Sequence, residues 1–81
     1  MCIRLCLMLI KVKSAPETRA QIVQVADIYR GKVLDVSPTS LVIELTGDVK
    51  KLRGFVEIMH NYGVLEIAKT GVVAMSRGEK L

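Results

Sequence analysis

Aromatic side chains are scarce in this chain of 81 residues: they make up 4% of it, and tryptophan is absent. Phe55, Tyr29 and Tyr62 all fall in helical patterns, so no predicted strand offers aromatic faces on which nucleic-acid bases could stack. The formal net charge of +4 comes from basic residues scattered along the sequence, as on a solvated surface. We therefore expect no nucleic-acid partner.

Cysteine is nearly absent as well, with only Cys2 and Cys6 in the chain. On an extended strand these two would lie about 13 Å apart, which is too far for a disulfide. Their spacing is not the C-x-x-C of a metal site, and there is no second pair. We expect two reduced thiols, no bound metal and a cytoplasmic location.

Long hydrophobic runs are missing too. The longest, Leu5 to Ile10, ends at Lys11 and is far shorter than the roughly 20 residues that cross a bilayer. It also lacks the small-residue cleavage site of a signal peptide. No membrane partner is expected.

Groupings typical of catalysis are lacking. The single histidine, His60, has no acid pair nearby, and Gly47 alone cannot form a phosphate-binding loop. Asp35 and Glu44 are an imaginable acid pair, but we expect them on a broad sheet face beside Lys11. We expect no catalytic, cofactor-binding or metal-binding residues, no cofactor, and no enzymatic activity of the chain by itself.

What the chain does have is a 51% share of apolar residues on a body large enough for one domain only. A domain of this size hides only about 60% of the surface that its unfolded chain exposes. So large an apolar share suggests that part of it is buried against a partner.

The order of the periodic segments predicts strand, helix, strand, strand, helix, strand. An alternating segment at 7–13 precedes a helix that starts with a capping box of Ser14 and Glu17 and ends at Gly31 in a left-handed conformation. Residues 32–36 and 40–46 form a hairpin around the turn at Ser37, Pro38 and Thr39. Asp48 caps the second helix, Gly63 ends it, and residues 64–69 form the last strand.

Two right-handed crossovers joined by a hairpin indicate an α+β, ferredoxin-like (ACT-like) βαββαβ fold. It has a four-stranded antiparallel sheet with two helices on one face and the first and third strands in its centre. We expect one domain over 1–81, with a divergent lead-in at 1–6 and a tail at 70–81.

Alternation along the strands divides their side chains between two faces. The face expected under the helices carries Met8, Ile10, Val12, Leu34, Val36, Leu41, Ile43, Leu45, Leu65 and Ile67. The face expected to lack a helix carries Leu7, Leu9, Lys11, Val33, Asp35, Val42, Glu44, Glu66 and Ala68, with Lys11 between the two glutamates. Such a mixed surface is typical of an interface, so we predict that it meets another chain, giving a homo-oligomer, or is covered by the tail.

The tail provides further interface candidates. Val72, Val73 and Met75 follow the last predicted strand, and Gly71 favours a change of direction there. Of the two alternatives, extension of the strand or docking elsewhere, we favour docking on a partner.

Four segments carry a family resemblance: LIKV at Leu9–Val12, ETRAQI at the start of the first helix, the hairpin from Asp35 to Gly47, and the ending GVLEIAKTGVVAMSRG. Together they resemble the C-terminal domain of the small, regulatory subunit of acetolactate (acetohydroxyacid) synthase. The resemblance covers nearly the whole chain. The segment Met1 to Cys6 departs from it, because the family has charged residues there.

The resemblance implies a dimer that binds the thiamine-diphosphate-dependent catalytic subunit of acetolactate synthase and helps to activate it. That partner would carry out the catalysis, in the synthesis of valine, leucine and isoleucine. Valine inhibition would belong to an ACT domain that comes first in the family, and this chain starts too late to contain that site.

Two alternatives remain. An ACT-like sensor would bind an amino acid or a nucleotide at a dimer interface, but no glycine-bearing ligand loop follows the first strand. A small enzyme on this fold, such as an acylphosphatase, would need an arginine in a phosphate-binding loop there, which Lys13 and Ser14 do not provide.

Overall fold

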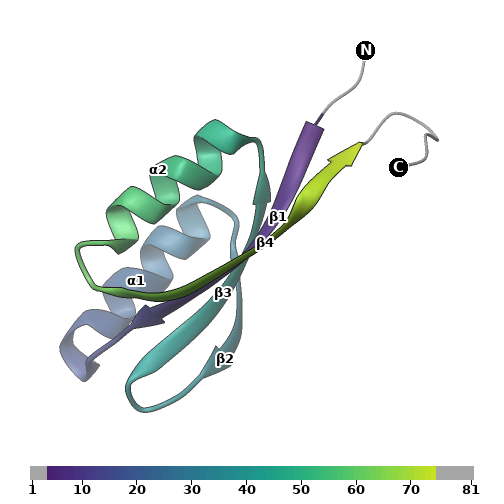
Figure 1. The fold of residues 1–81 in the computed structure, drawn as a ribbon. Helices are drawn as coiled ribbons and strands as arrows, with labels where there is room; N and C mark the ends of the chain where they lie inside the picture. The colour runs from purple at the N-terminus through teal and green to yellow at the C-terminus, as the bar shows by residue number, and fades with distance from the viewer. Residues whose placement is uncertain (1–3, 75–81) are drawn as a thin grey trace.

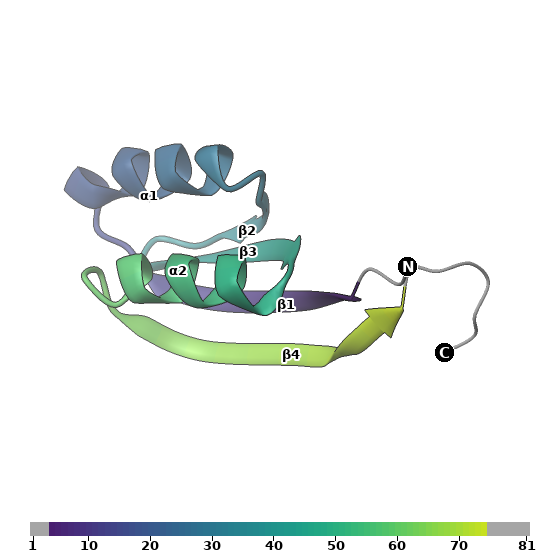
Figure 2. The ribbon, with the colours of Figure 1, turned by 90° about the horizontal axis from the view of Figure 1, so that it is seen from above.

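The computed structural model describes residues 4–74. In that part, the elements in chain order are β1 (Arg4–Lys13), α1 (Pro16–Ile28), β2 (Lys32–Val36), β3 (Ser40–Gly47), α2 (Val49–Met59) and β4 (Val64–Ala74). The strands form one antiparallel sheet in the order β2-β3-β1-β4, and both helices lie on the same side of it (Figures 1 and 2). The prediction of a ferredoxin-like α+β fold is confirmed.

The hydrophobic core lies between the helices and the two central strands. Its members are Cys6, Met8, Ile10 and Val12 of β1, Leu41, Ile43 and Leu45 of β3, Ile22 and Ala26 of α1, and Leu52, Phe55 and Met59 of α2. The rings of Phe55 and Tyr29 meet edge to face, with their centroids 5.2 Å apart. Every central-strand residue that we predicted under the helices is buried there.

Helix α1 begins one residue later than the sequence suggested. The Ser14 amide still donates to the Thr39 carbonyl at 2.8 Å, which keeps Ser14 in the extended chain that follows β1. Ala15 is therefore the N-cap, and the Thr18 hydroxyl oxygen accepts from the Ala15 amide at 3.0 Å. The predicted capping box of Ser14 and Glu17 is wrong, whereas Asp48 caps α2 as predicted and accepts from an amide in its first turn.

Arg19 of α1 ties the helix to the turn between β2 and β3. Its Nη2 donates to the carbonyl oxygens of Ser37 at 2.9 Å and Pro38 at 3.0 Å. Across the same turn the hydroxyl oxygens of Ser37 and Ser40 lie 2.8 Å apart. These bonds satisfy carbonyls that a tight turn leaves without backbone partners. They hold the turn between β2 and β3 against α1.

The end of α1 differs from the prediction. Arg30, not Gly31, adopts the left-handed conformation, with φ of 61°. Space favours glycine at 31, because a Cβ there would lie 3.1 Å from Ile43 Cγ2 and 3.3 Å from the Glu44 carbonyl oxygen. The chain leaves the helix so close to β3 that a side chain at 31 would make contacts tighter than ordinary van der Waals distances.

Gly63, which follows α2, has φ of +113°, so the prediction of a left-handed residue after this helix is confirmed. Because side chains strongly disfavour this conformation, we expect Gly63→Ala to lower the free energy of unfolding by about 1–2 kcal/mol. Gly54→Ala is the matched control within α2, where alanine is favoured by about 0.5–1 kcal/mol and the added Cβ would lie 3.3 Å from the hydroxyl end of the Tyr29 side chain. Urea unfolding followed by circular dichroism measures both, and equal losses would contradict the backbone argument.

Strands β1 and β4 are longer than predicted and pair beyond the helices, as Figure 2 shows. The register joins Arg4 to Ala74, so β4 continues through Gly71 instead of changing direction. The expected turn at Gly71 is therefore wrong, and the structure shows the alternative, extension of the strand. Docking of this segment on a partner stays a prediction. The long apolar start of β1 provides the pairing partner that keeps this segment in the sheet. Met75 lies outside the described residues.

The two edge strands contain irregularities that shift their faces. In β2 the register steps from Val33 opposite Ile43 to Asp35 opposite Val42, so Leu34 is an extra residue and is exposed. In consequence Val33 packs against the core, and our placement of it on the uncovered face is wrong.

A similar step in β4 makes Leu65 the extra residue between Val64 and Glu66. All four edge-strand residues that we predicted under the helices are exposed: Leu34, Val36, Leu65 and Ile67. The prediction is wrong for the extra residues Leu34 and Leu65, whereas Val36 opposite Leu41 and Ile67 opposite Ile10 lie on the helix side as predicted.

Candidate interaction surface

The side of the sheet without helices presents one continuous surface, which we call the open face. It consists of Leu7, Leu9 and Lys11 of β1, Asp35 of β2, Val42 and Glu44 of β3, and Glu66 and Ala68 of β4. Pairing brings these residues together: Leu9 lies between Glu44 and Ala68, and Lys11 lies between Val42 and Glu66. Within residues 4–74, no helix covers this surface (Figure 2).

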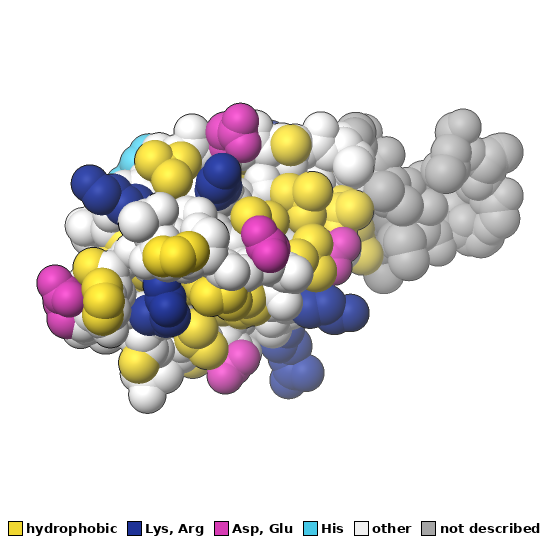
Figure 3. Space-filling model, turned by 90° about the horizontal axis from the view of Figure 1, so that it is seen from below, with side chains coloured by type: hydrophobic (Ala, Val, Ile, Leu, Met, Phe, Trp, Pro, Cys, Tyr) yellow, Lys and Arg dark blue, Asp and Glu magenta, His cyan; other side chains and the backbone are white. Residues whose placement is uncertain are grey.

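The middle of the open face is apolar and only partly exposed. Leu9, on a central strand, keeps 36% of its surface accessible, and Leu7 and Val42 are half-buried. Leu9, Lys11, Val42, Glu66 and Ala68 line a shallow hollow of about 370 Å³. Viewed from below, the molecule shows yellow apolar side chains between charged ones (Figure 3). A partner that fills this hollow would remove apolar area from water.

The charged residues of the open face follow the register rather than the arrangement we expected. Lys11 lies directly opposite Glu66, but Glu44 lies opposite Leu9 on one side and Lys32 on the other. The expectation that Lys11 sits between the two glutamates holds for Glu66 and fails for Glu44, which is its diagonal neighbour. Basic and acidic groups thus alternate around the apolar centre, as at the rim of an interface.

The remaining interface candidates fall into two groups. Val33 belongs to the core side, as described above. In the extended part of β4, Val72 pairs with Cys6 and Val73 with Leu5. Their part in an interface stays a prediction.

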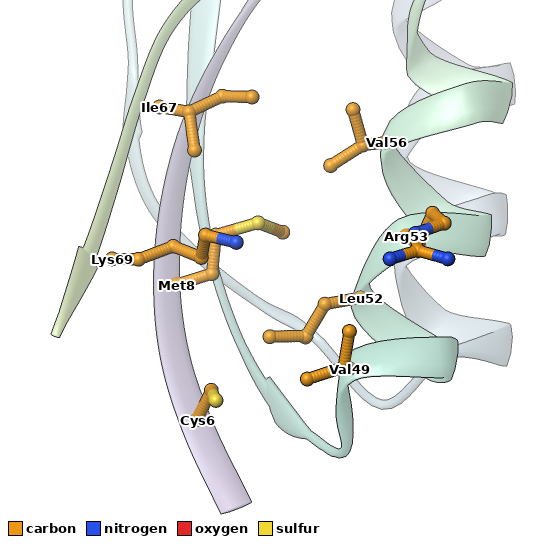
Figure 4. Close-up of a pocket in the computed structure, with 8 residues that line it drawn as sticks. All are labelled: Cys6, Met8, Val49, Leu52, Arg53, Val56, Ile67 and Lys69. Carbon is orange, nitrogen blue, oxygen red and sulfur yellow. The ribbon is translucent and has the colours of Figure 1, made fainter. Parts of the chain in front are cut away.

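A second hollow, which we did not predict from the sequence, lies between the first turns of α2 and the strands β1 and β4 (Figure 4). We call it the α2–β4 cavity. It is lined by Cys6, Met8, Val49, Leu52, Arg53, Val56, Ile67 and Lys69 and has a volume of about 200 Å³. Two features of the sequence could have indicated this cavity: the apolar residue Val49 at the start of α2, and Ile67 and Lys69 two positions apart on β4.

Among the described residues, no three histidine, cysteine or acidic side chains come close enough to hold a metal ion. None of the helices in this part of the chain has the length and apolar character needed to cross a membrane. His60 is exposed at the C-cap of α2, and Asp35 lies opposite Val42 on β3 rather than opposite Glu44.

The fold and the open face define a small α+β module built to present a sheet surface. Residues 6–78 match the protein family described as the small subunit of acetolactate synthase. The chain belongs to this family, and the resemblance inferred from its motifs is confirmed.

Individual relatives agree with the family match. A probable acetolactate synthase small subunit of Archaeoglobus fulgidus is 47% identical over 74 residues, which are 91% of this chain and 46% of the relative. The acetolactate synthase small subunit of Bacillus subtilis is 44% identical over 72 residues, covering 89% of this chain and 42% of that protein.

Among solved structures, the acetolactate synthase small subunit from Thermotoga maritima superimposes with a TM-score of 0.83 at 38% identity. The match covers 98% of this chain and 48% of that one. The chain therefore spans about half the length of the relatives that it matches.

Proposed function

We propose that residues 1–81 correspond to the C-terminal domain of an acetolactate synthase small subunit and act as a regulatory interaction module. In this proposal the chain forms a homodimer or higher oligomer in the cytoplasm. It binds the thiamine-diphosphate-dependent catalytic subunit, which carries the active site, and raises the activity of that subunit. The product of the reaction enters the synthesis of valine, leucine and isoleucine.

The observation that carries this proposal is the open face. The centre of the sheet, on the side without helices, is occupied by Leu7, Leu9 and Val42, and charged groups surround these three residues. In a solvated antiparallel sheet, the outer face of a central strand is polar. Leucines at these positions are instead typical of a surface that is covered in the assembled protein.

The family membership supplies the identity of the partner. Small subunits take their name from an assembly with a larger one, so a surface free for contact is an expected part of this chain. The long paired arm of β1 and β4 extends the sheet past the helices and lengthens the surface available to a partner.

The test is a binding and activation assay with the acetolactate synthase catalytic subunit of the same organism. We expect the tagged chain to retain the catalytic subunit on a column and to raise its kcat several-fold. The Lys50→Gln variant, altered at an exposed position at the start of α2, is a control that should behave like the unmodified chain. A chain that neither retains nor stimulates the catalytic subunit would refute the assignment.

A further inference from the structure

The α2–β4 cavity lies on the helix side of the sheet, away from the open face. Its floor is formed by core residues, since Met8, Leu52 and Cys6 are all buried. Its walls are apolar but open to solvent: Val49 of α2 is 52% exposed and Ile67 of β4 is 43% exposed. In Figure 4 Ile67 and Lys69 extend from β4 toward α2, and Leu52 extends from α2 toward the strands.

The size of the cavity limits what can occupy it. Its volume of about 200 Å³ exceeds the roughly 150 Å³ of an apolar cavity that accepts benzene. It falls below the roughly 300–1,000 Å³ of sites for drug-sized ligands. A ligand of about six to ten non-hydrogen atoms therefore fits.

The charged side chains at the cavity determine the sign of the charge that a bound ligand should carry. Arg53 on α2 and Lys69 on β4 line opposite walls, and Figure 4 shows the Lys69 ammonium pointing from β4 toward the helix. The eight lining residues include no acidic side chain. Glu57, one turn further along α2, does not line the cavity. Two cations beside an apolar floor complement a group that is anionic at one end and aliphatic at the other.

The geometry points to a binding site for a small aliphatic monocarboxylate. Its hydrocarbon part lies on Met8, Leu52 and Ile67, and its carboxylate accepts hydrogen bonds from Arg53 and Lys69. A free amino acid with the same side chain is disfavoured, because its ammonium group would meet the same two cations with no carboxylate in the lining to balance it. The site is separate from the open face, so it does not depend on the proposed function.

The probe is 4-methylpentanoate, titrated into the full chain while methyl and amide signals are followed by NMR. We expect saturable shifts confined to the lining residues, with a millimolar Kd. The uncharged 4-methylpentanamide and the zwitterion leucine have nearly the same shape, and each should bind about tenfold more weakly or not at all. Equal affinity for acid and amide, or shifts that never saturate or lie elsewhere, would overturn the proposal.

Variants test whether binding depends on the cations that line the cavity or on the overall charge of the protein. Lys69→Gln should weaken binding of 4-methylpentanoate about tenfold, whereas Lys32→Gln, an exposed lysine on β2 outside the cavity, should leave it unchanged. Val49→Asp should abolish binding without unfolding, because an acidic residue is favoured in the first turn of a helix. Equal effects of the two lysine variants, or undiminished binding by Val49→Asp, would refute the site.

Discussion

Replacing Phe55 by alanine is expected to remove about 3–5 kcal/mol from the free energy of unfolding. The ring is fully buried in the core and packs edge to face on Tyr29. A domain of this length has a total stability of about 4–12 kcal/mol at 0.05–0.15 kcal/mol per residue. The loss is therefore a large part of the total stability.

Urea unfolding followed by circular dichroism measures this loss. Ile28→Ala is the control, because Ile28 is a large apolar residue of α1 but 76% exposed, so its truncation should change stability by no more than about 0.5 kcal/mol. If Phe55→Ala cost no more than Ile28→Ala, Phe55 would not be the centre of the core.

Leu9→Asp is expected to convert the proposed oligomer into a folded monomer. Leu9 is partly exposed in the single chain, so a carboxylate there remains hydrated when the chain is alone. In an interface over the open face the same carboxylate would be buried without a partner, at a cost of about 2–5 kcal/mol. The dissociation constant of the proposed dimer should rise at least about thirtyfold.

Light scattering coupled to size exclusion measures the mass, and circular dichroism checks that the variant remains folded. Val42→Asp, on the neighbouring strand, should have the same effect. Ile28→Asp, on α1 and outside the open face, should leave the mass unchanged. An unchanged mass for both open-face variants would contradict an interface at that surface.

The central strands could be predicted from the sequence because burial and alternation agree there. Leu41, Ile43 and Leu45 lie two positions apart, and all three are buried, as the simple alternation required. The edge strands could be predicted only in part. Asp35 and Glu66 lie on the predicted face, whereas Val33 does not, because one extra residue in a strand shifts the alternation. Leu34 and Leu65 are such residues, and no local signal separates them from ordinary strand leucines.

The two ends of α1 show a second limit of prediction from the sequence. Ser14 and Glu17 have the spacing of a capping box, but the bond from the Ser14 amide to the Thr39 carbonyl decides where the helix begins. Gly31 was correctly recognised as marking the end of α1 but for the wrong reason, since it makes room for β3 while Arg30 takes the left-handed conformation. At both ends of α1, a contact between residues far apart in the sequence determines the local structure.

The two candidate sites differ in the same way. The open face follows from periodicity on single strands, so most of its members were predicted. The α2–β4 cavity joins the first turns of a helix to two strands, and its members share no periodic pattern. Which helical turn lies over which strand residue depends on the crossover geometry, which periodicity alone does not define.

The central claim, that the open face contacts another chain, is tested most directly by isotope-filtered NMR on a mixture of labelled and unlabelled protein. We predict nuclear Overhauser effects between different molecules at the methyl groups of Leu7, Leu9 and Val42. The claim would be contradicted if the protein had the mass of a single chain and showed no such contacts, neither by itself nor in a mixture with the catalytic subunit.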